Sequence, residues 1–389
     1  MFTIKIDKTF LQIIKLFYQV GIWQSSKESR FRETGRKLFY AFFGALFPIF
    51  LATNAFLCTD RNESIFSANG AIIVSVLYVK LLYLLFKKQE ILGFFNDQSV
   101  VHSIENREIY EKTSKTIRKF MSFVRPYCLA FFITAFLLVL IELPIFSARK
   151  GLPAFISLSW NDSEIIYWLA YFYVTFSIFM CISINLFTPF IWYIMLNYSI
   201  EYELLGHKCR RLGAGKKTVE TRVKKQKDFG LTQRSMFAES LIVLIKAHRS
   251  LAGTIERFRS CFSTLFMGQI TTSGIGICVS VYNLAFASKE SIVQREMNLV
   301  LLLYGIFDIL FVMYLANDIT LASDRLSYCL FESNWTEQTE SCKKYVLIMG
   351  EVLKQPQRLM ILIYPMNLET FMTIINGAYS MFNILKNFQ

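Results

Sequence analysis

The sequence predicts an all-α membrane protein with seven transmembrane helices, a cytoplasmic N-terminus and an extracellular C-terminus. Three observations lead to this prediction. The 389 residues are 54% apolar and 16% aromatic, with a mean hydropathy of +0.39, which is more apolar than the core of a soluble domain requires. The apolar residues gather in runs long enough to cross a bilayer. Positive charges gather in alternate connecting segments, as they do on the cytoplasmic side of membrane proteins.

Seven apolar runs are candidate transmembrane helices, because a helix needs about 20 mostly apolar residues to cross the hydrocarbon core. They cover residues 38–57, 70–86, 127–147, 165–196, 261–286, 299–319 and 366–385. The first run follows a basic stretch that ends at Lys37. It lies too far from the N-terminus, and is too long, for a signal peptide, so we expect it to be retained.

The distribution of Lys and Arg predicts the orientation. Of the 42 basic residues, 35 lie in the N-terminal segment and in the loops after the second, fourth and sixth predicted spans. Six lie in the remaining loops and at the C-terminal end, and Lys80 lies within a span. Since short basic loops stay in the cytoplasm, the N-terminus is predicted inside and the C-terminus outside.

These spans divide the chain into six regions. They are a cytoplasmic N-terminal segment (1–37), transmembrane helices one to four (38–196), a cytoplasmic loop with helix extensions (197–260), helices five and six (261–319), a second cytoplasmic segment (320–362) and the seventh helix (363–389).

The sequence argues against an enzyme, a metal site and a nucleic-acid partner. Its eight cysteines form no CxxC motif and mostly lie in apolar runs, and its three histidines are far apart, so neither a disulfide framework nor a zinc site is expected. We find no catalytic grouping or phosphate loop, and we predict no cofactor. The net charge of +13 follows from the cytoplasmic loops and from contact with anionic lipid.

The last predicted span carries a polar stripe. Its polar residues recur at steps of three and four, which places them on one helix face: Glu369, Thr373, Asn376, Ser380, Asn383 and Asn387. The other face is apolar: Phe371, Ile374, Ile375, Phe382, Ile384 and Leu385. Amides that faced lipid would be costly, so the stripe meets either a water-filled pore or neighbouring helices.

We favour the pore interpretation, which requires several subunits around an axis because one polar helix cannot enclose a channel. The residues predicted to line the pore are Thr373, Asn376, Ser380, Asn383, Lys386 and Asn387.

Three ionisable residues lie inside the other predicted spans. Lys80 and Glu142 are near the ends of their spans, where we expect each to reach the membrane interface and anchor its helix. Asp308 is deeper, so it is a candidate for a functional buried charge, with a satisfied interhelical hydrogen bond as the alternative.

The outer halves of spans two, three, four and six are rich in aromatic and aliphatic side chains with a few hydroxyls. Such walls suit a small, volatile, mostly apolar ligand, although each residue taken alone also fits lipid contact or core packing. The predicted ligand-binding residues are Val76, Phe136, Leu140, Tyr167, Tyr171, Phe172, Thr175, Tyr304 and Phe307.

The last part of the chain resembles the insect odorant receptor family in the order and spacing of its motifs. The matching residues are Leu321, Ser323 and Leu326, then Phe331-Glu332-Ser333-Asn334-Trp335, Gln355-Pro356, Pro365, Leu368-Glu369-Thr370-Phe371, and Ala378-Tyr379-Ser380 through Leu385. The motifs are specific over about the last fifty residues. Before that, the resemblance depends on length, seven spans and the cytoplasmic N-terminus.

The resemblance implies an odorant-gated, non-selective cation channel in the plasma membrane of sensory dendrites. It implies a tuning subunit that assembles with co-receptor subunits as a heterotetramer, with the seventh helices lining the pore. It also implies that cytoplasmic extensions, here about 197–260 and 319–362, form an anchor between subunits. Two residues depart from the family pattern: Phe331 replaces the usual Tyr, and Lys386 stands where Gln is common.

We therefore predict a channel subunit that binds a small volatile odorant within the outer half of the helix bundle. A gustatory receptor channel is the alternative, but Tyr379-Ser380 favours the odorant branch. A G-protein-coupled receptor would place the basic loops on the wrong side of the membrane. A transporter is disfavoured because no pair of interrupted spans recurs in the two halves.

Overall fold

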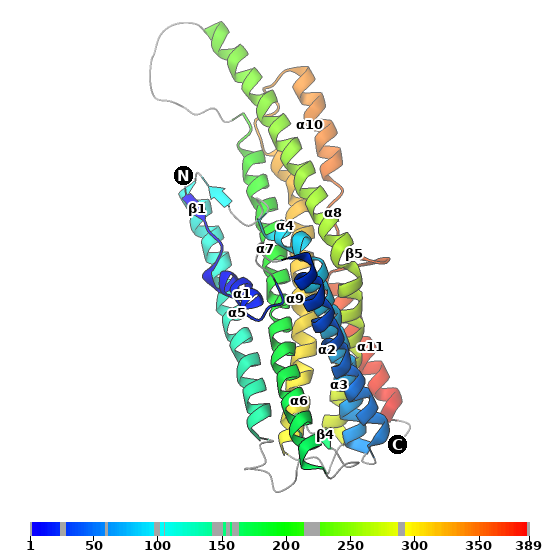
Figure 1. Cartoon of the computed structure of the whole chain (residues 1–389). Coiled ribbons are helices and arrows are strands. Elements are labelled where there is room, and N and C mark those ends of the chain that lie inside the picture. Colours follow the sequence, from blue (N-terminus) through cyan, green and yellow to red (C-terminus); the bar gives the residue numbers. More distant parts are fainter. Residues whose placement is uncertain are drawn as a thin grey trace.

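The computed structural model is a bundle of long helices (Figure 1). The described residues are 2–23, 29–58, 61–96, 102–104, 106–141, 151–152, 156–157, 163–213, 226–286 and 292–386. The helices are α1 (Lys8–Gln19), α2 (Arg30–Leu57), α3 (Arg61–Phe86), α4 (Lys88–Asn96), α5 (Arg107–Ile141), α6 (Glu164–Asn185), α7 (Phe187–Arg210), α8 (Gln226–Phe286), α9 (Ile292–Phe331), α10 (Glu340–Leu353) and α11 (Leu368–Lys386).

Three short antiparallel strand pairs accompany the helices. Strand β1 (Phe2–Ile4) pairs with β2 (His102–Ile104). The other two pairs are β3 (Gly151–Leu152) with β4 (Ile156–Ser157), and β5 (Met360–Ile361) with β6 (Tyr364–Pro365).

The described parts of all seven predicted spans fall on helices, residues 142–147 of the third span lie outside the described residues, and the all-α membrane fold is confirmed. By length and composition, five stretches among the described residues are able to cross a membrane: Phe31–Leu57, Glu63–Phe86, Glu164–Arg210, Met236–Phe286 and Asn298–Phe331. The third and seventh predicted spans lie on α5 and α11, which are not among these five. The second half of α5 is apolar and begins the third predicted span, which continues into residues outside the described part of the chain, and α11 carries the polar stripe.

Helix α8 is far longer than a bilayer is thick. Its 61 residues correspond to about 90 Å at about 1.5 Å per residue, against a hydrocarbon core of about 30 Å. The N-terminal strand and α10 lie toward one end of the bundle, and the C-terminus lies at the other (Figure 1). The bundle therefore extends well beyond the membrane at the end where α10 packs on α9.

The fourth predicted span is interrupted. Helix α6 ends at Asn185 and α7 begins at Phe187, with Leu186 at a turn between them. Pro189 explains the break, because it lacks the N–H that would bond the carbonyl of residue 185 and its ring crowds that carbonyl. The sequence analysis treated residues 165–196 as one helix and missed this interruption.

Helix α7 is central to the packing. Trp192, Tyr193 and Tyr198 are fully buried, and α7 packs along α9 and α8. The N-terminal segment covers one side of α7, where the ring of Phe10 stacks on Tyr193 with centroids 4.2 Å apart. Asp7 of the same segment forms an ion pair of 3.0 Å with Arg125 of α5.

Candidate ligand pocket and pore helix

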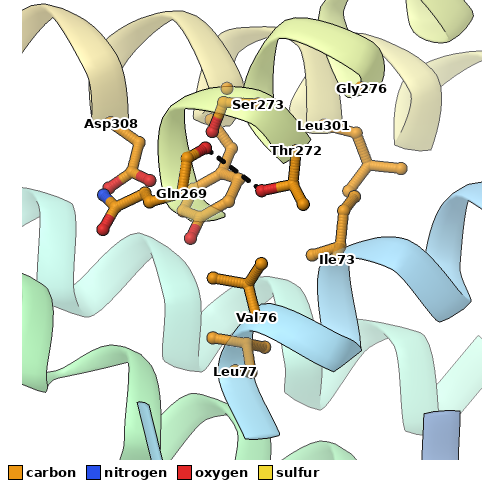
Figure 2. A pocket seen from close by; sticks show the side chains of 11 residues that line it. Ile73, Val76, Leu77, Gln269, Thr272, Ser273, Gly276, Leu301 and Asp308 are labelled. Atoms are coloured by element: carbon orange, nitrogen blue, oxygen red, sulfur yellow. Dashed lines mark hydrogen bonds between the residues drawn. The ribbon is translucent and has the colours of Figure 1, made fainter. Parts of the chain in front are cut away.

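A pocket lies between α3, α8 and α9, at the depth of the predicted spans (Figure 2). Its empty volume is about 360 Å³, including its open mouth. The lining residues are Ile73, Val76, Leu77, Gln269, Thr272, Ser273, Gly276, Leu301, Tyr304, Gly305 and Asp308. Most of these side chains are apolar or small, so the pocket suits a small and mainly apolar molecule.

The polar part of the pocket consists of Asp308 and Gln269. Both side chains are buried, with 1% and 4% of their surface exposed, and their polar ends lie next to each other in Figure 2. The amide of Gln269 lies against the carboxylate of Asp308 and interacts with it, although Oδ1 of Asp308 and Nε2 of Gln269 do not meet the strict geometry of a hydrogen bond with any described residue. The hydroxyl of Thr272, in contrast, is satisfied by the carbonyls of Gly268 and Gln269 at 2.9 and 3.1 Å.

The prediction that Lys80 anchors its helix at the membrane interface is wrong. Lys80 does not extend to the membrane interface, because its side chain is completely buried and its Nζ donates to Oγ1 of Thr188 at 2.7 Å. Lys80 and Asp308 interact electrostatically, but no ion pair within 4.0 Å joins them. Asp308 is buried as predicted, whereas Glu142 lies outside the described residues.

Further hydrogen bonds connect Lys80 with the pocket. Thr188 Oγ1 donates to Oδ1 of Asn185 at 3.4 Å, and the hydroxyl of Tyr304, which lines the pocket, donates to the same oxygen at 3.1 Å. Lys80 is on α3, Tyr304 is on α9, and Asn185 and Thr188 flank the α6–α7 break. We call these four residues the buried polar network.

The sequence analysis missed most of the polar residues at this site. Gln269, Ser273 and Gly276 are spaced by four and three residues, a pattern that marks one helix face, so the pocket side of α8 was open to prediction. No comparable signal identifies Asn185 or Thr188, because their role depends on the helix break.

The structure brings together two of the nine predicted ligand residues, Val76 and Tyr304, in this pocket. The others lie elsewhere. Tyr167 and Tyr171 are buried in a separate cluster, where the hydroxyl of Tyr171 donates to the carbonyl of Val139 at 3.0 Å. The remaining five are partly or largely exposed and line neither described cavity: Phe136, Leu140, Phe172, Thr175 and Phe307. Helical periodicity predicts a face, but it does not predict which neighbour that face meets.

A second cavity lies between α2, α3 and α6, with an empty volume of about 450 Å³. Its walls include Phe47, Val74 and Tyr173, and none of the nine predicted residues lines it. None of its lining residues has a buried side-chain polar atom that lacks a hydrogen-bond partner among the described residues. We therefore take the first pocket as the candidate ligand site.

Helix α11 has one packed face and one exposed face. Ile374, Ile375 and Phe382 are half-buried against the bundle, and α11 contacts α8 and α9. Five of the residues predicted to line the pore are described. Asn383 is half-buried, and the other four are exposed: Thr373, Asn376, Ser380 and Lys386. Asn387 lies outside the described residues.

The apolar face of α11 is only partly packed. Ile384, which was predicted on this apolar face, has 57% of its surface exposed. The packed face is narrower than the apolar pattern suggested, so an apolar residue borders the polar stripe. Within the stripe, the hydroxyls of Thr373 and Ser380 bond the carbonyls of Glu369 and Asn376, both at 3.0 Å.

The motif after the sixth span joins the far ends of α7 and α9. Glu332 forms an ion pair with Arg210 at the end of α7, and this hydrogen bond raises the pKa of Arg210 above its ordinary value. The rings of Phe331 and Trp335 pack edge to face at 5.9 Å. The motif therefore stabilises the part of the bundle that extends beyond the membrane.

These features define a class: a multi-pass helical membrane protein with a polar-lined pocket among its helices and an amphipathic C-terminal helix. The family model described as 7tm odorant receptor matches residues 63–379. The chain belongs to this family, and the resemblance predicted from the C-terminal motifs is confirmed.

Individual relatives agree with the family match. Odorant receptor 23a of Drosophila melanogaster is 24% identical over 299 residues, which are 75% of this chain and 74% of that protein. Odorant receptor Or2 of Anopheles gambiae is 21% identical over 342 residues, which are 84% of this chain and 85% of the relative.

The fold matches solved structures over nearly the whole chain. The insect olfactory receptor OR5 from Machilis hrabei superposes with a TM-score of 0.76 at 14% sequence identity, covering 97% of each chain. The structure of the same receptor in complex with eugenol superposes with a TM-score of 0.73 at 14% identity, covering 98% of this chain and 100% of the other.

Proposed function

We propose that this chain is the ligand-binding subunit of an odorant-gated, non-selective cation channel in the plasma membrane. The observation that carries the proposal is that the pocket and the candidate pore helix share the same supporting helices. Tyr304 and Asp308 of α9 and Ser273 of α8 line the pocket, and α11 packs on both α8 and α9. A ligand that favours one arrangement of these helices therefore biases α11 as well.

The connection on α8 is short. Gly274 follows the pocket residue Ser273, and a Cβ at Gly274 would lie 3.7 Å from Cγ2 of Ile374 on α11. A shift of α8 by a fraction of an ångström at the pocket would therefore be felt by the packed face of α11, because closely packed side chains do not deform freely.

The orientation follows from the charges. With 35 of 42 basic residues on one side, that side is cytoplasmic, and the C-terminus and the end of α11 are extracellular. The predicted direction is tested by adding an epitope before Met1 or after Gln389. Antibody should reach the C-terminal epitope on intact cells, and the N-terminal one only after permeabilisation. Labelling of the N-terminal epitope on intact cells would refute the orientation.

The assembly must contain several copies of α11. Its exposed stripe of Thr373, Asn376 and Ser380 needs water or protein around it, and a single helix cannot surround a pore. We propose a heterotetramer with co-receptor subunits, as the family resemblance implies, in the dendritic membrane of a sensory neuron. The ligand is a small volatile molecule, which is consistent with the eugenol complex of the Machilis hrabei receptor.

Current recordings test this function. Cells expressing the chain with a co-receptor should give non-selective cation currents when a panel of volatiles that includes eugenol is applied, and these currents should persist when G-protein signalling is blocked. Cells that express the co-receptor alone are the control. Normal surface expression without any current specific to the chain, or currents abolished by the G-protein block, would overturn the proposal.

A further inference from the structure

We infer that the chain binds an anionic phospholipid of the inner leaflet on the outer surface of α2, α3 and α6. The lipid phosphate would lie beside the cations Arg36, Lys37 and Lys88, and one acyl chain would enter the cavity between α2, α3 and α6. This lipid site is separate from the pocket between α3, α8 and α9. The inference goes beyond the proposed odorant and channel function, and it uses only the proposed orientation, which assigns the leaflet.

The first argument is a cluster of positive charge where α2 begins and α3 ends. Nζ of Lys37 lies 2.7 Å from Oε1 of Glu33 and 5.9 Å from the centre of the Phe86 ring, so the start of α2 meets the end of α3. Glu33 also interacts electrostatically with Lys88, the first residue of α4, and with Arg36. Within this cluster of described residues, one carboxylate faces three cations. The excess positive charge complements a phosphate group.

The second argument is depth in the membrane. Helix α2 has 28 residues, which correspond to about 42 Å at about 1.5 Å per residue, whereas the hydrocarbon core is about 30 Å thick. About 20 residues cross this core, and that number counted back from Leu57 reaches Leu38. Arg36 and Lys37 therefore lie at the level of the headgroups. Leu38 and Phe39, which follow them, have 62% and 50% of their surface exposed and offer apolar contact to lipid.

The third argument is a cavity that begins one helical turn from the cations. Tyr40 lines the cavity between α2, α3 and α6, and it follows Arg36 by four residues, which places both on one side of α2. Val74 and Leu81 belong to the apolar wall, and the empty volume is about 450 Å³, including the open mouth. Phe176 also lines the cavity and is 48% exposed. The cavity therefore opens on the outside of the bundle, where an acyl chain can enter.

The fourth argument is that the tyrosines in this wall already have hydrogen-bond partners. The hydroxyl of Tyr40 donates to the carbonyl of Val20, and the hydroxyl of Tyr173 donates to the carbonyl of Phe43 at 3.3 Å. The wall therefore offers mainly hydrocarbon surface, which suits an acyl chain. A zwitterionic lipid would fit such a cavity equally well, so the preference for an anionic lipid depends on the cations.

Binding is measured on the purified full-length chain in a nonionic detergent as the lipid-induced rise in the unfolding temperature. The probes are dioleoyl phosphatidylserine, dioleoyl phosphatidylcholine and glycerol phosphate, so that headgroup charge and acyl chains vary separately. We expect phosphatidylserine to act at about tenfold lower concentration than phosphatidylcholine, and glycerol phosphate to have no effect. Equal potency of the two lipids, or equal stabilisation by glycerol phosphate, would overturn the inference. The epitope test of the orientation decides the leaflet independently.

One pair of variants tests the headgroup contact. Lys37→Gln should weaken phosphatidylserine about fivefold and leave phosphatidylcholine unchanged. Lys343→Gln is the matched control, because Lys343 also pairs with a glutamate of its own helix, Glu340, and its side chain is 29% exposed, against 30% for Lys37. An equal loss of phosphatidylserine binding in the two variants would refute the assignment of the headgroup.

A second pair of variants tests the acyl-chain contact. Val74→Phe should fill part of the cavity and weaken both lipids several-fold, because the two lipids share their acyl chains. Val243→Phe is the control, since Val243 is 62% exposed on α8 and lines neither cavity. If Val74→Phe does not fold, Ser177→Leu on the α6 wall replaces it. Unchanged lipid binding in the folded cavity variant would refute the acyl-chain site, and altered subunit assembly with unchanged lipid binding would assign this surface to a protein partner and overturn the inference.

Discussion

Removing one of the two buried charges should strongly destabilise the protein. Lys80 and Asp308 have 0% and 1% of their surface exposed. Lys80→Met would leave the carboxylate of Asp308 buried without a counter-charge, and Asp308→Leu would do the same to the ammonium group. Loss of one partner from a buried charge pair costs about 3–5 kcal/mol of the free energy of unfolding. Lys80→Met also loses the hydrogen bond to Thr188, worth about 1 kcal/mol.

The double variant Lys80→Met with Asp308→Leu should be less destabilised than the two single variants added together. It removes both charges, so no ion remains uncompensated in the bilayer. Interacting residues of this kind show coupling energies of about 0.5–3 kcal/mol. We expect the lower part of this range, because the two charges are not in direct ion-pair contact.

The measurement is the free energy of unfolding of purified variants in detergent, together with surface expression in cells. Lys354→Met is the matched control, because the Lys354 side chain is 60% exposed and pairs with Glu351 on the surface. Exposed substitutions of this kind change stability by less than about 0.5 kcal/mol. If the buried single variants behaved like this control, or if their effects were additive in the double variant, the two charges would not compensate each other.

Three further predictions concern packing, pH and conduction. Gly350→Ala should lower the unfolding temperature, because the new Cβ would lie 2.5 Å from Cζ of Phe331. Gly253→Ala is the control and should raise the unfolding temperature slightly, because no atom lies within 4 Å of the new Cβ and Ala favours a helix over Gly. Burial lowers the pKa of His248 in the folded protein, so as the pH drops below about 6.5 the imidazole is protonated in the unfolded chain before it is protonated in the folded protein. The free energy of unfolding should therefore fall with pH in this range. The variant His248→Gln should lose less stability on acidification in unfolding experiments. Lys386→Gln should increase single-channel cation conductance modestly, since a charge at the mouth is screened within about 8 Å, and unchanged conductance and block would place Lys386 away from the ion path.

The helices of the membrane region could be predicted because their length and apolar character are local properties of the sequence. The two faces of α11 were also largely visible, since Ile374 and Phe382 pack on the bundle and Thr373 and Asn376 are exposed. The boundary between the faces was not visible, as Ile384 shows. Where a helix meets no neighbour, an apolar residue can remain exposed to lipid or to another subunit, and periodicity alone does not reveal this.

The ligand site was predicted less well for a physical reason. A pocket forms where faces of several helices meet, and the rotation of each helix depends on all its neighbours. Val76 and Tyr304 belong to the pocket, whereas Phe172 has 67% of its surface exposed. The side chain of Lys80 was predicted in the wrong place for the same reason. Its position near the end of a span did not indicate that the hydroxyl of Thr188, on another helix, would accept its hydrogen bond inside the bundle.

The acceptor for Lys80 is the hydroxyl of Thr188, which lies beside the interruption between α6 and α7. Broken helices persist at membrane depth when neighbouring groups satisfy the freed polar atoms. Here the break introduced by Pro189 lies beside the buried polar network, where Asn185 accepts from Tyr304 and Thr188 accepts from Lys80. Tyr304 also lines the pocket, and α7 continues from the break to Arg210, which pairs with Glu332. We therefore expect a ligand that moves Tyr304 to act, through its hydrogen bond to Asn185, on the junction of α6 and α7, which connects the pocket with the far end of the bundle.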